Sequence, residues 1–123
     1  MKKRCLTFAF WLCTVTAWAD CDKTKTDYDV VYCGTKIYLQ ADKELNDAYQ
    51  KLVGKLNTDG KKLLKTGQRA WIETRNQQCA EKRERTILVD LDCATHTTVA
   101  RTQFLTDRHR ECVSTGCMNS RLQ

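Results

Sequence analysis

Apolar side chains recur along most of the chain at spacings of three and four residues, which is the period of an amphipathic α-helix. Between residues 35 and 57 these positions are Tyr38, Ala41, Leu45, Ala48, Tyr49, Leu52 and Leu56. Between residues 61 and 80 one face carries Leu64, Gln68, Trp71, Arg75 and Cys79. We therefore predict two helices, over 35–57 and 61–80, joined by the turn-forming and capping sequence Thr58-Asp59-Gly60.

A third helix is predicted over 93–111, where Ala94, Thr98, Arg101 and Leu105 share a face. Before it, residues 81–85 read as a charged connector. Residues 86–91 are apolar and β-branched, which fits either a short strand or the start of a helix, and both alternatives stay open. The chain has no proline and only five glycines, which favours helices over a turn-rich β-sandwich. The expected fold is a small all-α bundle, built on an antiparallel helical hairpin with a third helix.

The first 19 residues have the pattern of a secretory signal peptide. Basic residues at 2–4 precede an apolar run over 5–17, and Ala17 and Ala19 supply small side chains at positions −3 and −1 of a cleavage site. The run is shorter than the roughly 20 apolar residues that a membrane-spanning helix needs, so we predict no membrane span. Cleavage near Ala19 leaves one domain, 20–123, which we place in a bacterial periplasm or outside the cell.

Two of the eight cysteines belong to this leader, and six remain in the predicted mature chain: Cys21, Cys33, Cys79, Cys93, Cys112 and Cys117. An even number of cysteines in a short exported chain predicts three disulfides that staple the bundle.

The antiparallel hairpin suggests how these cysteines pair. Cys33 precedes the first helix and Cys79 ends the second, so we predict that they form one disulfide. A continuous third helix would hold Cys93 and Cys112 about 28 Å apart, beyond the reach of a disulfide. For the other cysteines, the sequence suggests the pairs Cys21 with Cys93, and Cys112 with Cys117.

The same hairpin predicts a polar cluster between the first two helices. Facing residues of an antiparallel pair with a turn near Thr58 have numbers that sum to roughly 117. By this rule Asp42 faces Arg75, Asn46 faces Trp71, and Tyr49 faces Gln68. A partly buried guanidinium needs acceptors, so we predict an ion pair between Arg75 and Asp42, assisted by Asn46. This cluster is interpreted as architecture that fixes register, with Trp71 in the core.

Charge and composition argue against several functional classes. The predicted mature chain carries 18 Lys and Arg against 15 Asp and Glu, a net charge of +3. Its cations form no concentrated stripe with aromatic platforms, so no nucleic-acid partner is predicted. The two histidines, His96 and His109, lie on the third helix about 20 Å apart, too far to act together. Since Cys93 is expected in a disulfide, we predict no metal site with His96, no cofactor and no catalytic residues.

Two stretches resemble a known family: Ala41-Asp42-x-x-Leu45-Asn46-x-x-Tyr49-x-x-Leu52, and Gln68-Arg69-Ala70-Trp71-Ile72-x-x-Arg75-x-x-x-Cys79. Together with Cys93, Thr98, Arg101 and Leu105, they are similar to the signature of the YecT-like family, also called the LprI-type lysozyme inhibitor N-terminal domain. The resemblance covers nearly the whole mature chain. It implies a small exported helical protein that inhibits a lysozyme or another peptidoglycan hydrolase by protein–protein binding. The alternative is an envelope interaction module with no inhibitory role. The oligomeric state stays open.

A lysozyme cleaves glycosides with two carboxyl groups in a cleft, so an inhibitor needs an exposed loop that offers cations or hydroxyls. We predict such contacts in the loop between Cys112 and Cys117, at Ser114 and Thr115, with Arg108 and Arg110 nearby. Arg69 and Glu73 lie off the packed face of the second helix and are further candidates.

Overall fold

The computed structural model describes residues 21, 23 and 25–123. The predicted signal peptide and its cleavage site lie outside the described residues. Within the described part, no helix is both long and apolar enough to cross a membrane.

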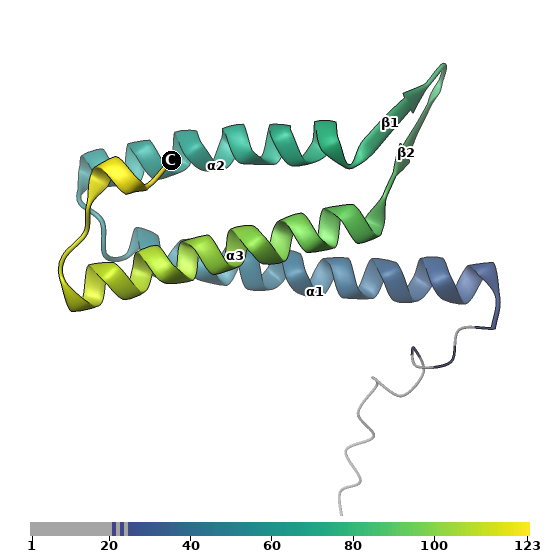
Figure 1. Cartoon of the computed structure of the whole chain (residues 1–123), viewed down its shortest axis with the longest axis horizontal. Coiled ribbons are helices and arrows are strands. Elements are labelled where there is room, and N and C mark those ends of the chain that lie inside the picture. Colours follow the sequence, from purple (N-terminus) through teal and green to yellow (C-terminus); the bar gives the residue numbers. More distant parts are fainter. Residues whose placement is uncertain (1–20, 22, 24) are drawn as a thin grey trace, which may run out of the picture.

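The described chain forms three long helices and one small β-hairpin (Figure 1). The helices are α1 (Asp27–Val53), α2 (Thr58–Gln78) and α3 (Leu91–Ser114). Strands β1 (Ala80–Arg83) and β2 (Thr86–Val89) connect α2 to α3, and a 3-10 turn, η1 (Asn119–Arg121), lies near the C-terminus. The predicted disulfide-stapled helical bundle is therefore confirmed, with a two-stranded sheet added to it.

The helix starts differ from the prediction because capping residues set them. α1 begins eight residues earlier than expected, at Asp27, where Thr26 and Asp29 form a reciprocal capping box. The backbone amides of Lys25 and Thr26 both donate to the Asp29 carboxylate, which lowers its pKa. At the next helix, the Asn57 side chain accepts from the Gly60 amide at 2.8 Å, so the segment 58–60 opens α2 instead of forming the turn.

Residues 80–89, taken as a charged connector and an unassigned segment, form an antiparallel hairpin. Its register pairs Ala80 with Val89 and Arg83 with Thr86, which leaves Glu84 and Arg85 as a two-residue turn. The open choice for residues 86–91 is thus resolved as strand β2, followed by Asp90 as the N-cap of α3.

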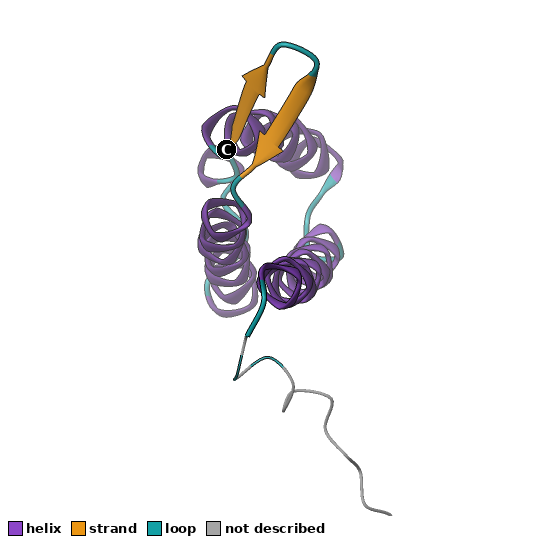
Figure 2. Ribbon diagram, turned by 90° about the vertical axis from the view of Figure 1, so that its right-hand side faces the viewer, coloured by secondary structure: helices purple, strands orange, loops and turns teal. Residues whose placement is uncertain are grey.

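The closest packing in the bundle joins α1 to α3, whereas the sequence suggested α1 and α2. Buried small side chains explain this approach: Ala41 and Ala48 of α1 lie with Ala94 and Thr98 of α3. α2 runs antiparallel to α1 at a greater distance, and the three helices form a triangle when viewed along the bundle (Figure 2). The inner face of α2 carries Trp71, and this bulky side chain requires the greater distance between α2 and α1.

The leucine core lies toward one end of the bundle. It comprises Leu45, Ala48, Leu52, Leu56, Leu64, Leu105 and Leu122. Leu122, almost at the C-terminus, is only 1% exposed because the tail folds back beneath α2. Gly67 allows this approach, since a Cβ there would lie 3.1 Å from the Cα of Gln123. We call this end, residues 45–64 and 105–123, the closed end, and the hairpin with residues 27–39 of α1 the open end.

The six cysteines from Cys21 onward form three disulfides, but two of the three predicted pairs are wrong. The structure joins Cys21 to Cys33 and Cys79 to Cys93, instead of Cys33 to Cys79 and Cys21 to Cys93. The early start of α1 places Cys33 inside the helix, and the hairpin returns the chain so that Cys93 meets Cys79. The third bond, between Cys112 and Cys117, is the pair that the sequence predicted.

Candidate interaction site

The predicted polar cluster lies on the inner face of α2, with Arg75 at its centre. The Arg75 side chain is 11% exposed, and its Nη1 lies 4.0 Å from Asp42 Oδ1, the outer limit of an ion pair. Asn46 donates to the Asp42 carboxylate at 3.2 Å, as expected for the residue that assists it. Arg75 also donates to Asn76 Oδ1 at 3.1 Å and to the Thr98 hydroxyl at 3.4 Å.

Arg75 also lies over two aromatic rings. The guanidinium carbon lies 5.0 Å from the ring centroid of Trp71 and 5.7 Å from that of Tyr38. A cation over an aromatic face is attracted by the ring quadrupole, so these contacts carry part of the stabilisation that an ion pair was expected to give.

The stack continues into α3, where the sequence prediction had not placed any member of the cluster. Arg101 lies 5.9 Å from the Trp71 ring and 4.4 Å from the Phe104 ring, and Arg108 lies 5.4 Å from the same Phe104 ring. We call the alternating series Tyr38, Arg75, Trp71, Arg101, Phe104 and Arg108 the arginine–aromatic ladder. The spacing of Arg101, Phe104 and Arg108 by three and four residues was the available signal, since such residues share one helix face.

Arg101 replaces Tyr49 as the partner of Gln68. Its Nε donates to Gln68 Oε1 at 3.0 Å, while Tyr49 packs against the leucine core. Burial lowers the pKa of Arg101, and its Nη2 is buried without a hydrogen-bond partner among the described residues. The ladder thus keeps three guanidinium groups, those of Arg75, Arg101 and Arg108, partly buried among the helices.

Of the four candidate partner contacts near the C-terminus, three are exposed to solvent and one is mostly buried. Ser114 and Thr115 are exposed, although both hydroxyls donate to the Glu111 carbonyl oxygen, at 3.4 and 3.2 Å. Arg110 is exposed and pairs with Asp107 at 3.1 Å. Arg108 was expected beside them, but its side chain is 15% exposed and pairs with Glu111 at 2.7 Å. Since it also stacks on Phe104, it is not available to a partner.

The two candidates on α2 face outward. Arg69 and Glu73 are both exposed, and Glu73 accepts from Gln77 at 3.4 Å. The exposed Ile72 lies between them in sequence and adds an apolar side chain to the outer surface of α2.

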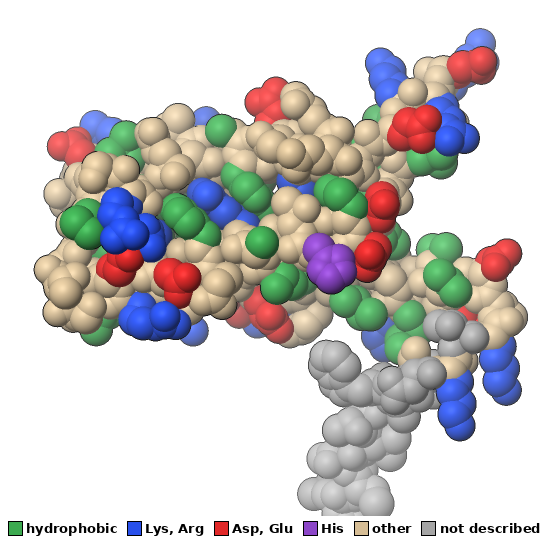
Figure 3. Space-filling view, in the orientation of Figure 1, with side chains coloured by type: hydrophobic (Ala, Val, Ile, Leu, Met, Phe, Trp, Pro, Cys, Tyr) green, Lys and Arg blue, Asp and Glu red, His purple; other side chains and the backbone are tan. Residues whose placement is uncertain are grey.

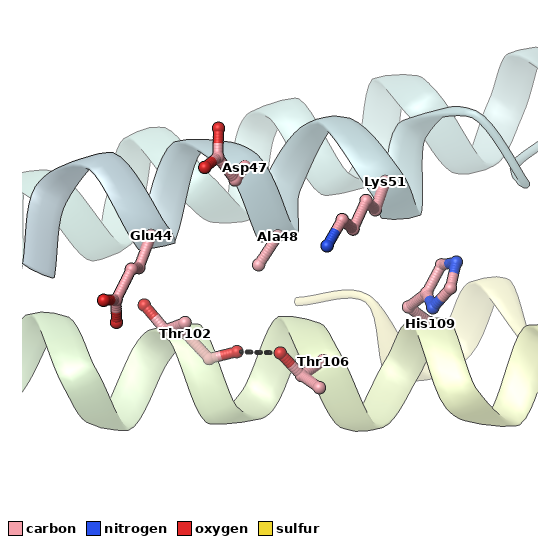
Figure 4. Close-up of a pocket in the computed structure, with 7 residues that line it drawn as sticks. All are labelled: Glu44, Asp47, Ala48, Lys51, Thr102, Thr106 and His109. Carbon is pink, nitrogen blue, oxygen red and sulfur yellow. Dashed lines mark hydrogen bonds between the residues drawn. The ribbon is translucent and has the colours of Figure 1, made fainter. Parts of the chain in front are cut away.

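A shallow groove of about 350 Å³ between α1 and α3 contains His109 (Figure 4). Glu44 lies at one end of the groove and His109 at the other, so these two side chains do not contact each other. Lys43 pairs with Asp47 at 2.7 Å, which raises the pKa of Lys43 and lowers that of Asp47. The Thr106 hydroxyl donates to the Thr102 carbonyl. These groups are engaged within their own helices.

Metal-ligating groups do not gather in the part of the chain that the structure describes: no three of its His, Cys, Asp or Glu side chains could hold an ion together. His96 lies on the first turns of α3, 3.5 Å from Asp92, and Cys93 is bonded to Cys79.

The open end carries the most extensive exposed apolar surface. Nine of the thirteen exposed large apolar side chains among the described residues lie there: Tyr28, Val30, Val31, Tyr32, Ile37, Leu39, Ile87, Leu88 and Val89. Between the hairpin and α1 is a groove of about 650 Å³, whose lining includes Leu39, Ile87 and Val89 together with Arg75. Figure 3 shows the hairpin and the first part of α1 projecting on the same side, with a hollow between them. Large exposed apolar patches are typical of protein-interaction sites, which makes the open end a candidate interaction surface.

The fold and its surface therefore define a small disulfide-bonded helical protein whose arginine–aromatic ladder serves packing, and most of whose exposed large apolar groups gather at one end. The family model described as "Lysozyme inhibitor LprI" matches residues 19–105 of the chain. The protein belongs to this lysozyme inhibitor family. Residues 106–123, which include the Cys112–Cys117 loop and the buried tail, lie beyond the match. Comparison with curated proteins and with solved structures finds no match to the chain.

Proposed function

We propose that this protein inhibits a lysozyme or another peptidoglycan hydrolase by binding to it. The match of residues 19–105 to the lysozyme inhibitor family is the observation that carries the proposal. The exposed apolar surface of the open end supports a binding role, because it offers an area that association would remove from water.

The proposed setting is the periplasm or the external medium, reached after cleavage near Ala19 to leave a single domain, 20–123. Three disulfides support an oxidising compartment, since such bonds do not persist in most cytosols. The family match begins at Ala19, beside the proposed cleavage site, which also supports this reading.

Charge limits how the proposed complex forms. With 18 Lys and Arg against 15 Asp and Glu after residue 19, the net charge of +3 gives no long-range attraction to a basic lysozyme. Affinity must then come from short-range contacts. Ser114, Thr115 and Arg110 at the closed end and Arg69 and Glu73 on α2 are proposed contacts that present suitable polar groups.

The test is a titration of the purified, oxidised protein into hydrolase assays with several classes of lysozyme and with bacterial amidases. The proposal expects a concentration-dependent loss of activity and a complex detectable by calorimetry. Absence of both at micromolar protein would remove it.

The second candidate function is an envelope interaction module that binds without inhibiting. The exposed groove of the open end supports it, since that surface is suited to binding whatever the activity of the partner. A complex with a hydrolase that remains fully active would favour this alternative.

A further inference from the structure

The β-hairpin projects clear of the helical bundle, which makes it the most accessible element of the open end (Figures 1 and 2). All four residues of β2 are exposed, and in β1 only Ala80 is half-buried. An isolated two-stranded sheet gains little from its own packing, and its edges are open to a partner. Four paired residues per strand give the hairpin a reach of about 14 Å beyond its base.

The base of the hairpin is fixed. The Cys79–Cys93 disulfide closes it, and the Asp90 amide donates to the Cys79 carbonyl at 2.8 Å. Asp90 also caps α3 by accepting from the Cys93 amide at 2.9 Å. A projection held in this way can enter a partner with little additional ordering, which reduces the entropic cost of binding.

The tip of the hairpin concentrates charge. Arg83 makes two hydrogen bonds to the Glu81 carboxylate, both at 3.0 Å, on the same strand. Arg85, in the turn, makes no ion pair with the described residues. Glu84 has a φ of 45°, a conformation that favours glycine or asparagine, so the turn holds a charged residue where a better turn former would fit.

We propose that this hairpin tip enters the substrate cleft of a glycosidase that cleaves peptidoglycan, where Arg85 donates hydrogen bonds to the catalytic carboxyl groups and Arg83, held by Glu81, adds a second positive charge. This inference rests on the proposed function and adds to it the contact that performs the inhibition. Glycosidases of this type place two carboxyl groups in a cleft, and a guanidinium matches a carboxylate with two parallel hydrogen bonds. Ile87 and Leu88, behind the tip, then contact the rim of the cleft.

The hairpin suits this role better than the Cys112–Cys117 loop at the other end. That loop lies against the α1–α2 turn, where Cys117 Sγ is 3.4 Å from the Lys55 carbonyl oxygen. The nearby Arg108 is engaged inside the bundle, and Arg110 is paired with Asp107. Arg85 is therefore better placed than either to meet a carboxylate of a partner.

The experiment compares two double variants that remove equal charge. Arg83→Ala with Arg85→Ala alters the tip, and Lys62→Ala with Lys65→Ala alters exposed lysines of α2 as the matched control. Both keep the disulfides and the core, and circular dichroism verifies that they fold. Inhibition constants are measured on the glycosidase that the natural protein inhibits, with and without a chitin oligosaccharide that occupies the cleft.

The inference expects the tip variant to bind about tenfold more weakly or worse, while the control stays within about twofold of the natural protein. It also expects the oligosaccharide to compete with the natural protein. Unchanged inhibition by the tip variant, or binding that the oligosaccharide leaves unaffected, would overturn the hairpin contact and leave the proposed function standing. Failure of the natural protein to inhibit any glycosidase, or inhibition of amidases alone, would overturn the contact because its target would be absent. Failure with every hydrolase would remove the proposed function as well.

Discussion

The closed and open ends of this bundle are stabilised by different interactions. At the closed end, leucines from all three helices and from the tail exclude water, and Leu52, Leu64 and Leu122 are each at most 1% exposed. At the open end, the disulfides Cys21–Cys33 and Cys79–Cys93 hold the chain, while valines, isoleucines and tyrosines remain exposed. A disulfide restrains the chain without consuming apolar surface. The closed end also contains a disulfide, Cys112–Cys117, but there it joins a leucine core. The difference teaches that disulfides at an end without such a core hold the chain while its apolar side chains stay exposed.

The largest effect on the free energy of unfolding is expected from removing a buried side chain at the closed end. Leu122→Ala should lower the free energy of unfolding by about 3 kcal/mol, because it removes a fully buried side chain and leaves a cavity between the tail and α2. Chemical denaturation measures the change. Val113→Ala is the control: its side chain is 63% exposed and its truncation should have almost no effect. Equal midpoints for both variants would contradict the assignment of the tail as part of the core.

Arg75→Ala tests the region between the two ends, where the arginine–aromatic ladder takes the place of leucines. The expected loss is about 2 kcal/mol, because the variant gives up two aromatic contacts and the pair with Asp42. The loss falls below that of a fully buried pair because the Asp42 side chain is 42% exposed, so solvent screens the attraction.

Arg69→Ala, on the outer face of the same helix, is the matched control, since its exposed side chain should contribute little. Thermal or chemical unfolding of both variants distinguishes them. A melting curve of Arg75→Ala that coincides with the natural one would show that the ladder adds no stability.

These two ends also differ in how far the sequence could predict them. The helices were predictable because their apolar period is local, and the inner face of α2, from Gln68 to Cys79, followed from the same period. The β-hairpin was not predictable, because its two-residue turn is Glu84-Arg85. The usual sequence signal for such a turn is Asn-Gly or Asp-Gly. Without the hairpin, the return of Cys93 to Cys79 could not be seen.

The partners within the polar cluster and the burial of the tail could not be predicted from the sequence, for a different reason. The register of Asp42 and Arg75 came from a local turn, but the partners of Gln68 and Trp71 lie on α3, and distant packing decides which helix meets them. Leu122 stands alone near the C-terminus, so no periodic pattern could mark it as buried. Only the folding back of the chain places it beneath Gly67.

Gly67→Ala sharpens the role of the closed end because its sign should depend on the tail. In an isolated helix, this change stabilises by about 1 kcal/mol. Here the new Cβ would lie 3.1 Å from Gln123 Cα and 3.2 Å from the Leu122 carbonyl oxygen, so the tail must shift. In the full chain we expect a loss of about 1 kcal/mol, typical of an overpacked site.

In a chain shortened by residues 122–123, the same substitution should instead stabilise by about 1 kcal/mol, since the obstacle is gone. Denaturation of the four proteins forms a double-mutant cycle. Stabilisation of equal size in both backgrounds would show that the tail does not press on α2.

The smallest effect is expected at the tip of the open end. Glu84 adopts a φ of 45°, which costs a residue with a Cβ more than it costs glycine. Glu84→Gly should therefore raise the free energy of unfolding by about 0.5 kcal/mol, a shift of roughly 3 °C in the melting temperature, after the greater freedom of glycine in the unfolded chain is deducted. Glu84→Ala removes the same charge but keeps the Cβ, so it should bring no gain. A gain of equal size from both substitutions would assign it to the lost charge, and the open end would then carry no conformational strain at its tip.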